Sequence, residues 1–187
     1  QNQNILLENK EMREMVKEMI PKMGTTVINN KFNLQIFLNE KCKDAINLTE
    51  FVDNLQLNLE DLNKTRREGY ISGITNIFVK GLRELELHKR PIHCCDLKRE
   101  VLYVRDNNEW GKENNNKDHI KGAINVVAKK QIGLIKLWEA NNPDWSKTDK
   151  GAEQYIKMVR SITDSGSQIS SENKIIRTIA KEVLIEK

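Results

Sequence analysis

The sequence predicts an α+β fold that is predominantly α-helical: a coiled-coil-like N-terminal helix followed by a helical domain with a small β-hairpin or meander. Apolar residues recur every three or four positions along most of the chain, as in amphipathic helices. One run, Glu100–Arg105, is instead rich in β-branched and aromatic residues. The 187 residues are enough to bury one core besides the N-terminal helix.

Residues 1–23 have the heptad pattern of an oligomerisation helix. Its two core positions are filled by Ile5, Met12 and Met19, and four residues later by Asn9, Val16 and Met23. An Asn at a core position fixes register and strand number. We therefore predict a homo-oligomer, a dimer or trimer, with residues 24–31 as a linker and 32–187 as the globular domain. The alternative is an amphipathic helix that packs on its own domain.

The globular domain opens with alternating Phe32, Leu34, Ile36 and Leu38, which predicts a short strand. The spacing then becomes helical. Thr49 is the expected N-cap of a helix, whose predicted buried face is Phe51, Val52, Leu55, Leu59 and Leu62. After the basic residues Lys64, Arg66 and Arg67, a long helix is predicted from the stripe Ile71, Ile74, Phe78, Leu82 and Leu85, and Pro91 ends it.

Two strands are predicted next, Ile92–Asp96 and Glu100–Arg105, with turn residues at 106–108. A helix followed by a basic hairpin resembles the arrangement of a winged helix. Further helices are expected from Asp118 to Asn142 and from Thr148 to Ile162. A linker at 163–168 leads to a last helix, capped by Ser170 or Ser171 and ending at Leu184.

Composition limits the compartment and the partners. The formal charge is +4, which is mildly basic. No apolar run approaches the roughly 20 residues of a membrane span, so no membrane partner is expected. Cys42, Cys94 and Cys95 are odd in number, which favours a reducing, intracellular setting.

Two stretches resemble a known group of proteins. They are FNLQIFLNEKCKDAINLTEFV and FVKGLRELELHKRPIHCCDLKREVLYVRDNNEW. Both are similar to uncharacterised proteins of giant viruses, the nucleocytoplasmic large DNA viruses, in which a zinc finger and a coiled coil precede such a domain. The resemblance implies a viral protein in the host cytoplasm, the viral factory or the virion. It departs at two points: the finger is absent here, and Cys95 stands where a serine is expected.

Catalytic and metal chemistry are disfavoured by the spacing. His88, His93, Cys94 and Cys95 lie close together, but no second ligand pair answers them, as a zinc site requires. His93 and Cys94 would point to opposite faces of a strand, which separates a thiol from its base. We therefore predict no catalytic residue, no metal ligand and no cofactor.

Nucleic-acid binding needs cations gathered on one face. The best candidates are Lys89, Arg90, Lys98, Arg99, Arg105, Lys129 and Lys130. The sequence thus favours a non-enzymatic oligomerisation and interaction module, which positions a partner or an adjacent nucleic-acid-binding segment. Direct DNA binding by the basic helix-plus-hairpin surface is the first alternative, and a metal-dependent nuclease is the second.

Overall fold

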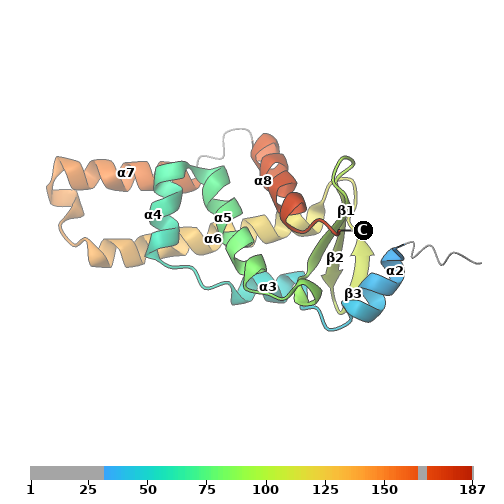
Figure 1. Cartoon of the computed structure of the whole chain (residues 1–187). Helices are drawn as coiled ribbons and strands as arrows, with labels where there is room; N and C mark the ends of the chain where they lie inside the picture. Colours follow the sequence, from blue (N-terminus) through green and yellow to red (C-terminus); the bar gives the residue numbers. More distant parts are fainter. Residues whose placement is uncertain (1–31, 164–167, 187) are drawn as a thin grey trace, which may run out of the picture. The chain divides into compact units, whose positions relative to one another are not determined.

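The computed structural model describes residues 32–163 and 168–186 (Figure 1). The predicted oligomerisation helix at 1–23 and the linker at 24–31 lie outside the described residues, so both stay predictions. The described part confirms a mainly helical α+β fold with one small antiparallel sheet.

The helical elements and strands follow one another in this order. They are α2 (Leu34–Ile36), the π-helical turn η1 (Phe37–Lys41), α3 (Leu48–Asn54), α4 (Leu59–Glu68), α5 (Tyr70–Arg83), the 3-10 turn η2 (Leu87–Lys89), β1 (Ile92–Asp96), β2 (Val101–Asp106), β3 (Glu109–Lys112), α6 (Asp118–Asn141), the 3-10 turn η3 (Trp145–Lys147), α7 (Asp149–Thr163) and α8 (Gln168–Glu182).

The sheet has the order β1-β2-β3, with Ile92 opposite Val104 and Arg105 opposite Trp110. The predicted turn is confirmed: Asn107 and Asn108 both have positive φ, as a tight hairpin turn between right-twisted strands requires. β3 was not predicted. On its other edge, β1 is bridged by Leu184, because Cys94 exchanges backbone hydrogen bonds with Val183 and Ile185.

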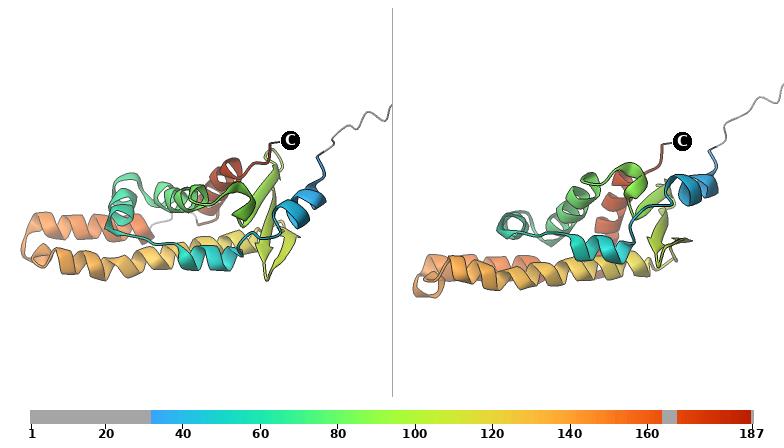
Figure 2. Two further views of the ribbon diagram at one scale, coloured as in Figure 1. Left: turned by 60° about the horizontal axis from the view of Figure 1, so that its bottom comes forward. Right: turned by 90° about the horizontal axis from the view of Figure 1, so that it is seen from below.

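The helices pack around two separate cores. The larger core joins α3, α5, the first half of α6, α8 and the inner face of β1 and β2. The smaller one holds Leu62 of α4, Trp138 of α6, and Met158 and Ile162 of α7. α6 runs away from the sheet and α7 returns beside it, which makes an antiparallel helical hairpin (Figures 1 and 2).

Several predicted boundaries were wrong for local reasons. The predicted strand at Phe32–Leu38 is helical from Leu34, because Leu38 turns inward to a fully buried position. The predicted helix after Thr49 is two helices, since Asn58 caps α4 in a reciprocal pair with Asp61. Asn47, not Thr49, is the residue that precedes α3.

At the C-terminal side, the last helix begins earlier than predicted. Ser170 and Ser171 lie inside α8, not at its cap. The helix predicted to run up to Pro91 ends at Arg83, and a 3-10 turn fills the interval.

Candidate functional sites

Six of the seven predicted nucleic-acid-binding residues lie in three pairs of sequence neighbours, and the seventh, Arg105, lies on β2. Lys98 and Arg99 are in the exposed turn between β1 and β2, where Arg99 is 3.9 Å from the carboxylate of Asp96. Lys89 and Arg90 precede β1, at its other end. Lys129 and Lys130 lie midway along α6. The structure therefore brings these residues together in pairs rather than in one cluster.

Three of these cations donate hydrogen bonds to backbone carbonyls of the fold. Arg105 donates to the carbonyls of Lys43 and Ala45, which holds the segment after η1 against β2. Lys130 donates to the carbonyls of Asp53 and Leu55 at the C-terminal end of α3. Arg90 donates to the carbonyl of Glu182 at 3.4 Å. These bonds give all three a structural role, whatever else they contact.

Lys129 belongs to a continuous exposed face of α6. We call it the open face, and it comprises Gly122, Asn125, Lys129, Ile132, Gly133 and Lys136. Their spacing of three and four residues places them on one side of the helix, opposite the buried Ile120, Ile124 and Val127. No Asp or Glu lies between His119 and Trp138. Ile132 is 45% exposed although it is apolar.

The open face has room for close approach. A Cβ added at Gly122 or Gly133 would meet no other atom within 4 Å. Lys129 and Lys136 form no hydrogen bond or ion pair with the other described residues. Of the open face, only Lys129 was among the predicted site residues, and the other five were missed by the sequence reasoning. The signal that could have found them was the long stretch of helix without a carboxylate.

A thiol and an imidazole do meet, but the thiol is not that of Cys94, the sequence neighbour of His93. Sγ of Cys42 lies 3.5 Å from Nε2 of His93, and both side chains are fully buried. The ring of Phe37 packs edge-on against the His93 ring at 5.1 Å, and the ring of Trp110 lies 5.4 Å away. Nε1 of Trp110 donates to the carbonyl of Cys42, which ties β3 to η1.

The environment of this pair suppresses nucleophilic chemistry. Burial lowers the pKa of His93 to about 4, and the charges of Arg90 and His88 add to the effect. Burial raises the pKa of the Cys42 thiol to about 11. Both groups are therefore neutral near pH 7, whereas a catalytic cysteine needs its thiolate. The contact supports packing of the sheet against η1 and gives no support to catalysis.

The third histidine, His119, contacts the carboxylate that caps the N-terminal end of α6. Glu113 is buried, and its carboxylate accepts hydrogen bonds from the backbone N–H of Asn114 and Ile120. Nδ1 of His119 lies 3.0 Å from the same carboxylate, which raises the pKa of His119. A carboxylate at the first turn of α6 is favoured by the positive end of the helix dipole.

Metal binding and membrane spanning have no candidate in this part of the chain. Across residues 32–163 and 168–186, no group of three His, Cys, Asp or Glu side chains is placed to hold a metal ion. None of the described helices combines the length and the apolar character needed to cross a bilayer.

Comparison of the chain with protein-family models, with curated proteins and with solved structures found no match.

Proposed function

We propose that the described unit is a non-enzymatic binding module whose open face on α6 contacts the phosphate backbone of duplex DNA. One observation carries this proposal: a long helix presents an exposed face that has two unpartnered lysines and no carboxylate. Affinity for DNA depends first on cations that displace counterions from phosphates.

The spacing of the two lysines suits a regular polyanion. Lys129 and Lys136 are separated by two helical turns, or about 10.5 Å along the axis. If α6 lies parallel to the duplex axis, this span covers about three base-pair steps, each of which rises about 3.4 Å along that axis. Gly122 and Gly133 lack side chains that would hold a phosphate backbone away from the helix.

The charge of the open face also argues against a second copy of the same helix as its partner. Two such faces in contact would bring lysines together, which is destabilising. The predicted homo-oligomer relies on residues 1–23 instead and is a separate proposal. Light scattering of the intact chain and of a variant beginning at Gly24 tests it, and a monomeric intact chain would contradict it.

Fluorescence anisotropy with a labelled duplex at several salt concentrations tests the DNA proposal. The logarithm of the binding constant should fall with the logarithm of salt, and Lys129→Ala with Lys136→Ala should reduce that slope by about 2, because each contact contributes about 0.9. The matched control is Lys174→Ala with Lys181→Ala, which removes two exposed lysines from α8. Equal losses in the two double variants, or an unbound duplex at low salt, would overturn the proposal.

A further inference from the structure

A second surface gathers more cations than the open face does. A cleft of about 630 Å³ lies between the end of α4, the start of α5 and α7. Arg66 and Arg67 of α4 and Lys157 and Arg160 of α7 line it, together with two carboxylates. We propose that this cleft binds a phosphate group.

Within residues 32–163 and 168–186, most of these cations have no hydrogen-bond or ion-pair partner. Arg66, Lys157 and Arg160 form no hydrogen bond or ion pair with the other described residues. Arg67 pairs with Glu60 at 2.8 Å, but both side chains are more than half exposed. An exposed pair of this kind contributes little and exchanges readily. Two guanidinium groups from neighbouring helices are the donors best matched to phosphate oxygens.

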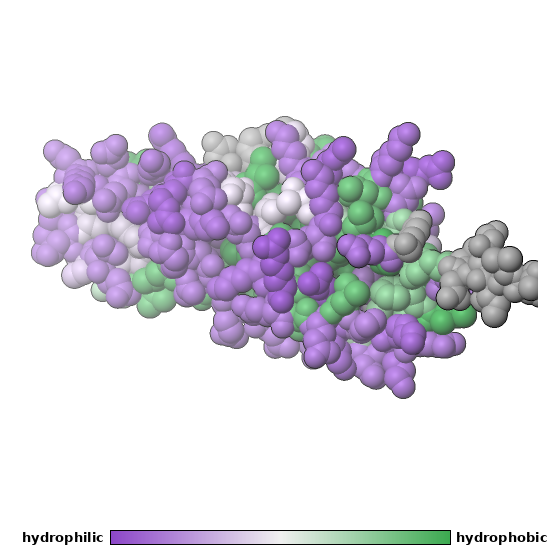
Figure 3. All heavy atoms as spheres, in the orientation of Figure 1, coloured by the Kyte–Doolittle hydropathy of each residue, from purple (hydrophilic) through white to green (hydrophobic). Residues whose placement is uncertain are grey.

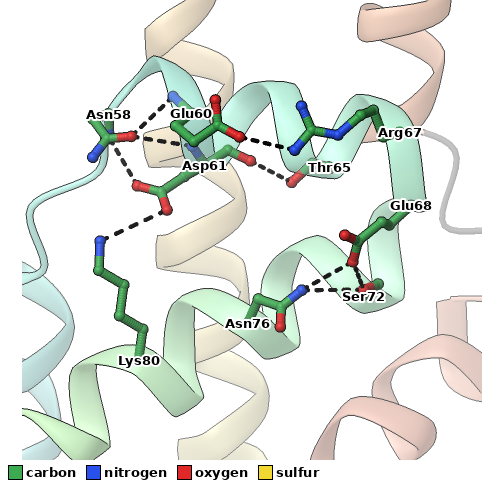
Figure 4. A network of polar contacts seen from close by, with 9 residues as sticks. All are labelled: Asn58, Glu60, Asp61, Thr65, Arg67, Glu68, Ser72, Asn76 and Lys80. Atoms are coloured by element: carbon green, nitrogen blue, oxygen red, sulfur yellow. Dashed lines mark hydrogen bonds and ion pairs between the residues drawn. The ribbon is translucent and has the colours of Figure 1, made fainter.

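The two carboxylates that line the cleft are Glu68 of α4 and Glu153 of α7, and neither forms an ion pair with its cations among the described residues. Glu68 accepts hydrogen bonds from Oγ of Ser72 at 2.6 Å and from Nδ2 of Asn76 at 3.2 Å. Figure 4 shows Glu68 pointing toward these two residues of α5, while Arg67 points toward Glu60. The bond from Ser72 is the main reason that the pKa of Glu68 is lowered. Glu68 therefore stays ionised, but its Oε2 is held by Ser72 and Asn76, and it forms no ion pair with the arginines of the cleft among the described residues.

Backbone N–H groups are also present at the same place. Gly69 and Tyr70 line the cleft at the start of α5, and no side chain caps this helix. The first N–H groups of α5 carry partial positive charge, but the last carbonyls of α4 carry partial negative charge at the same junction, so the cationic side chains supply the main attraction for a phosphate. Gly69 has φ of 90°, a conformation that other residues adopt only with strain, so the sharp α4–α5 junction depends on glycine.

The ligand chemistry has two sources, a free phosphorylated small molecule or a phosphate of a nucleic acid. The volume falls within the range of small-molecule sites, and Tyr70 and Ile156 give the cleft an apolar wall beside its cations. None of its lining residues belongs to α6, so this site is independent of the DNA proposal.

Calorimetric titration of the intact chain with sodium pyrophosphate at low salt tests the site. Arg66→Gln with Arg160→Gln should weaken pyrophosphate binding by about tenfold or more, because both bidentate donors are lost. Lys174→Gln with Lys181→Gln removes the same charge from exposed positions of α8 and should change binding by less than about twofold. Circular dichroism checks that all variants keep the fold.

A parallel titration with a short DNA duplex identifies the source. If the arginine variant also loses duplex affinity, the phosphate belongs to a nucleic acid; if only pyrophosphate binding falls, it belongs to a small molecule. Lys129→Ala with Lys136→Ala should leave pyrophosphate binding unchanged, which separates the two proposals. Absence of pyrophosphate binding, or an equal loss in the arginine and α8 variants, would overturn the site.

Discussion

The two ends of the described unit differ in the size of the apolar core that each one buries. We call the strands with α3, α5, α8 and the first half of α6 the sheet end, and we call α4, the second half of α6, η3 and α7 the hairpin end. The sheet end buries an apolar core drawn from six elements, whereas the apolar cluster of the hairpin end has four buried side chains. On the face shown in Figure 3, hydrophilic residues dominate the hairpin end, and hydrophobic residues gather nearer the sheet.

This difference indicates which end mainly stabilises the fold and which end offers side chains for binding. The sheet end uses its residues internally: even the buried Cys42–His93 pair and Arg105 serve packing and backbone contacts. The hairpin end leaves cations without partners at the cleft and at Lys136 of the open face. A thin core suffices there because the longest helix, α6, anchors the hairpin in the larger core.

The largest expected effect is on the free energy of unfolding, and it is tested with one core residue from each end. Phe78→Ala should lower the free energy of unfolding by about 3–5 kcal/mol, since Phe78 is fully buried in the larger core. Met158→Ala should lower it by about 2–3 kcal/mol, because the smaller cluster can relax around the cavity. Urea denaturation measures both. Hydrogen exchange in the Met158 variant should rise in α7 but not in α5; a global rise would contradict a separable hairpin end.

The next effect is acid sensitivity, which should originate at the sheet end. Between pH 6.5 and about 4, the imidazole of residue His93 is protonated in the unfolded chain but neutral in the folded chain. The free energy of unfolding therefore falls as the pH falls. The shift corresponds to a loss of about 3 kcal/mol across that window.

His119 acts in the opposite direction. Its raised pKa gives stability that is present at low pH and lost as the pH rises through that pKa. His119→Gln should therefore steepen the loss of stability on acidification, as measured by urea denaturation at several pH values. An NMR titration in which the His93 ring protonates near pH 6.5 would contradict the lowered pKa of His93 and its role in the acid sensitivity.

The smallest effects come from two glycines. A Cβ at Gly73 would clash with the side chain of Thr65, which is held by the carbonyl of Asp61 and by Gln131. Gly73→Ala should thus destabilise by about 1–3 kcal/mol. Gly133→Ala meets open space and should stabilise by up to about 1 kcal/mol through helix propensity. Thermal denaturation should shift in opposite directions, and shifts of the same sign would refute this difference in packing.

Periodicity predicted the elements whose pattern is long or chemically distinct. α6 follows the predicted span from Asp118 almost to its end, and β2 (Val101–Asp106) coincides closely with the strand predicted at Glu100–Arg105. The predictions for short segments were wrong, because tertiary contacts determine the secondary structure of such segments. The alternating run at Phe32 became helical, and β3 has no apolar alternation; its Trp110 is fixed by a carbonyl far away in sequence.

The candidate sites were less accessible to sequence reasoning for a similar reason. Arg66 and Arg67 stand out as a basic pair before Gly69, but Lys157 and Arg160 reach them only because α7 folds back onto α4. Likewise, the spacing of His93 and Cys94 pointed away from a thiol–imidazole contact, whereas the actual partner, Cys42, lies 51 residues earlier.

The bridge formed by Leu184 has a consequence for how copies of this unit meet. An uncovered strand is a template that recruits strands from other molecules, and residues 183–185 shield β1 from that fate. Within the described residues, the opposite margin is β3, a four-residue strand with charged Glu109 and Lys112 at its ends. Cross-strand polymerisation is thereby discouraged on both sides.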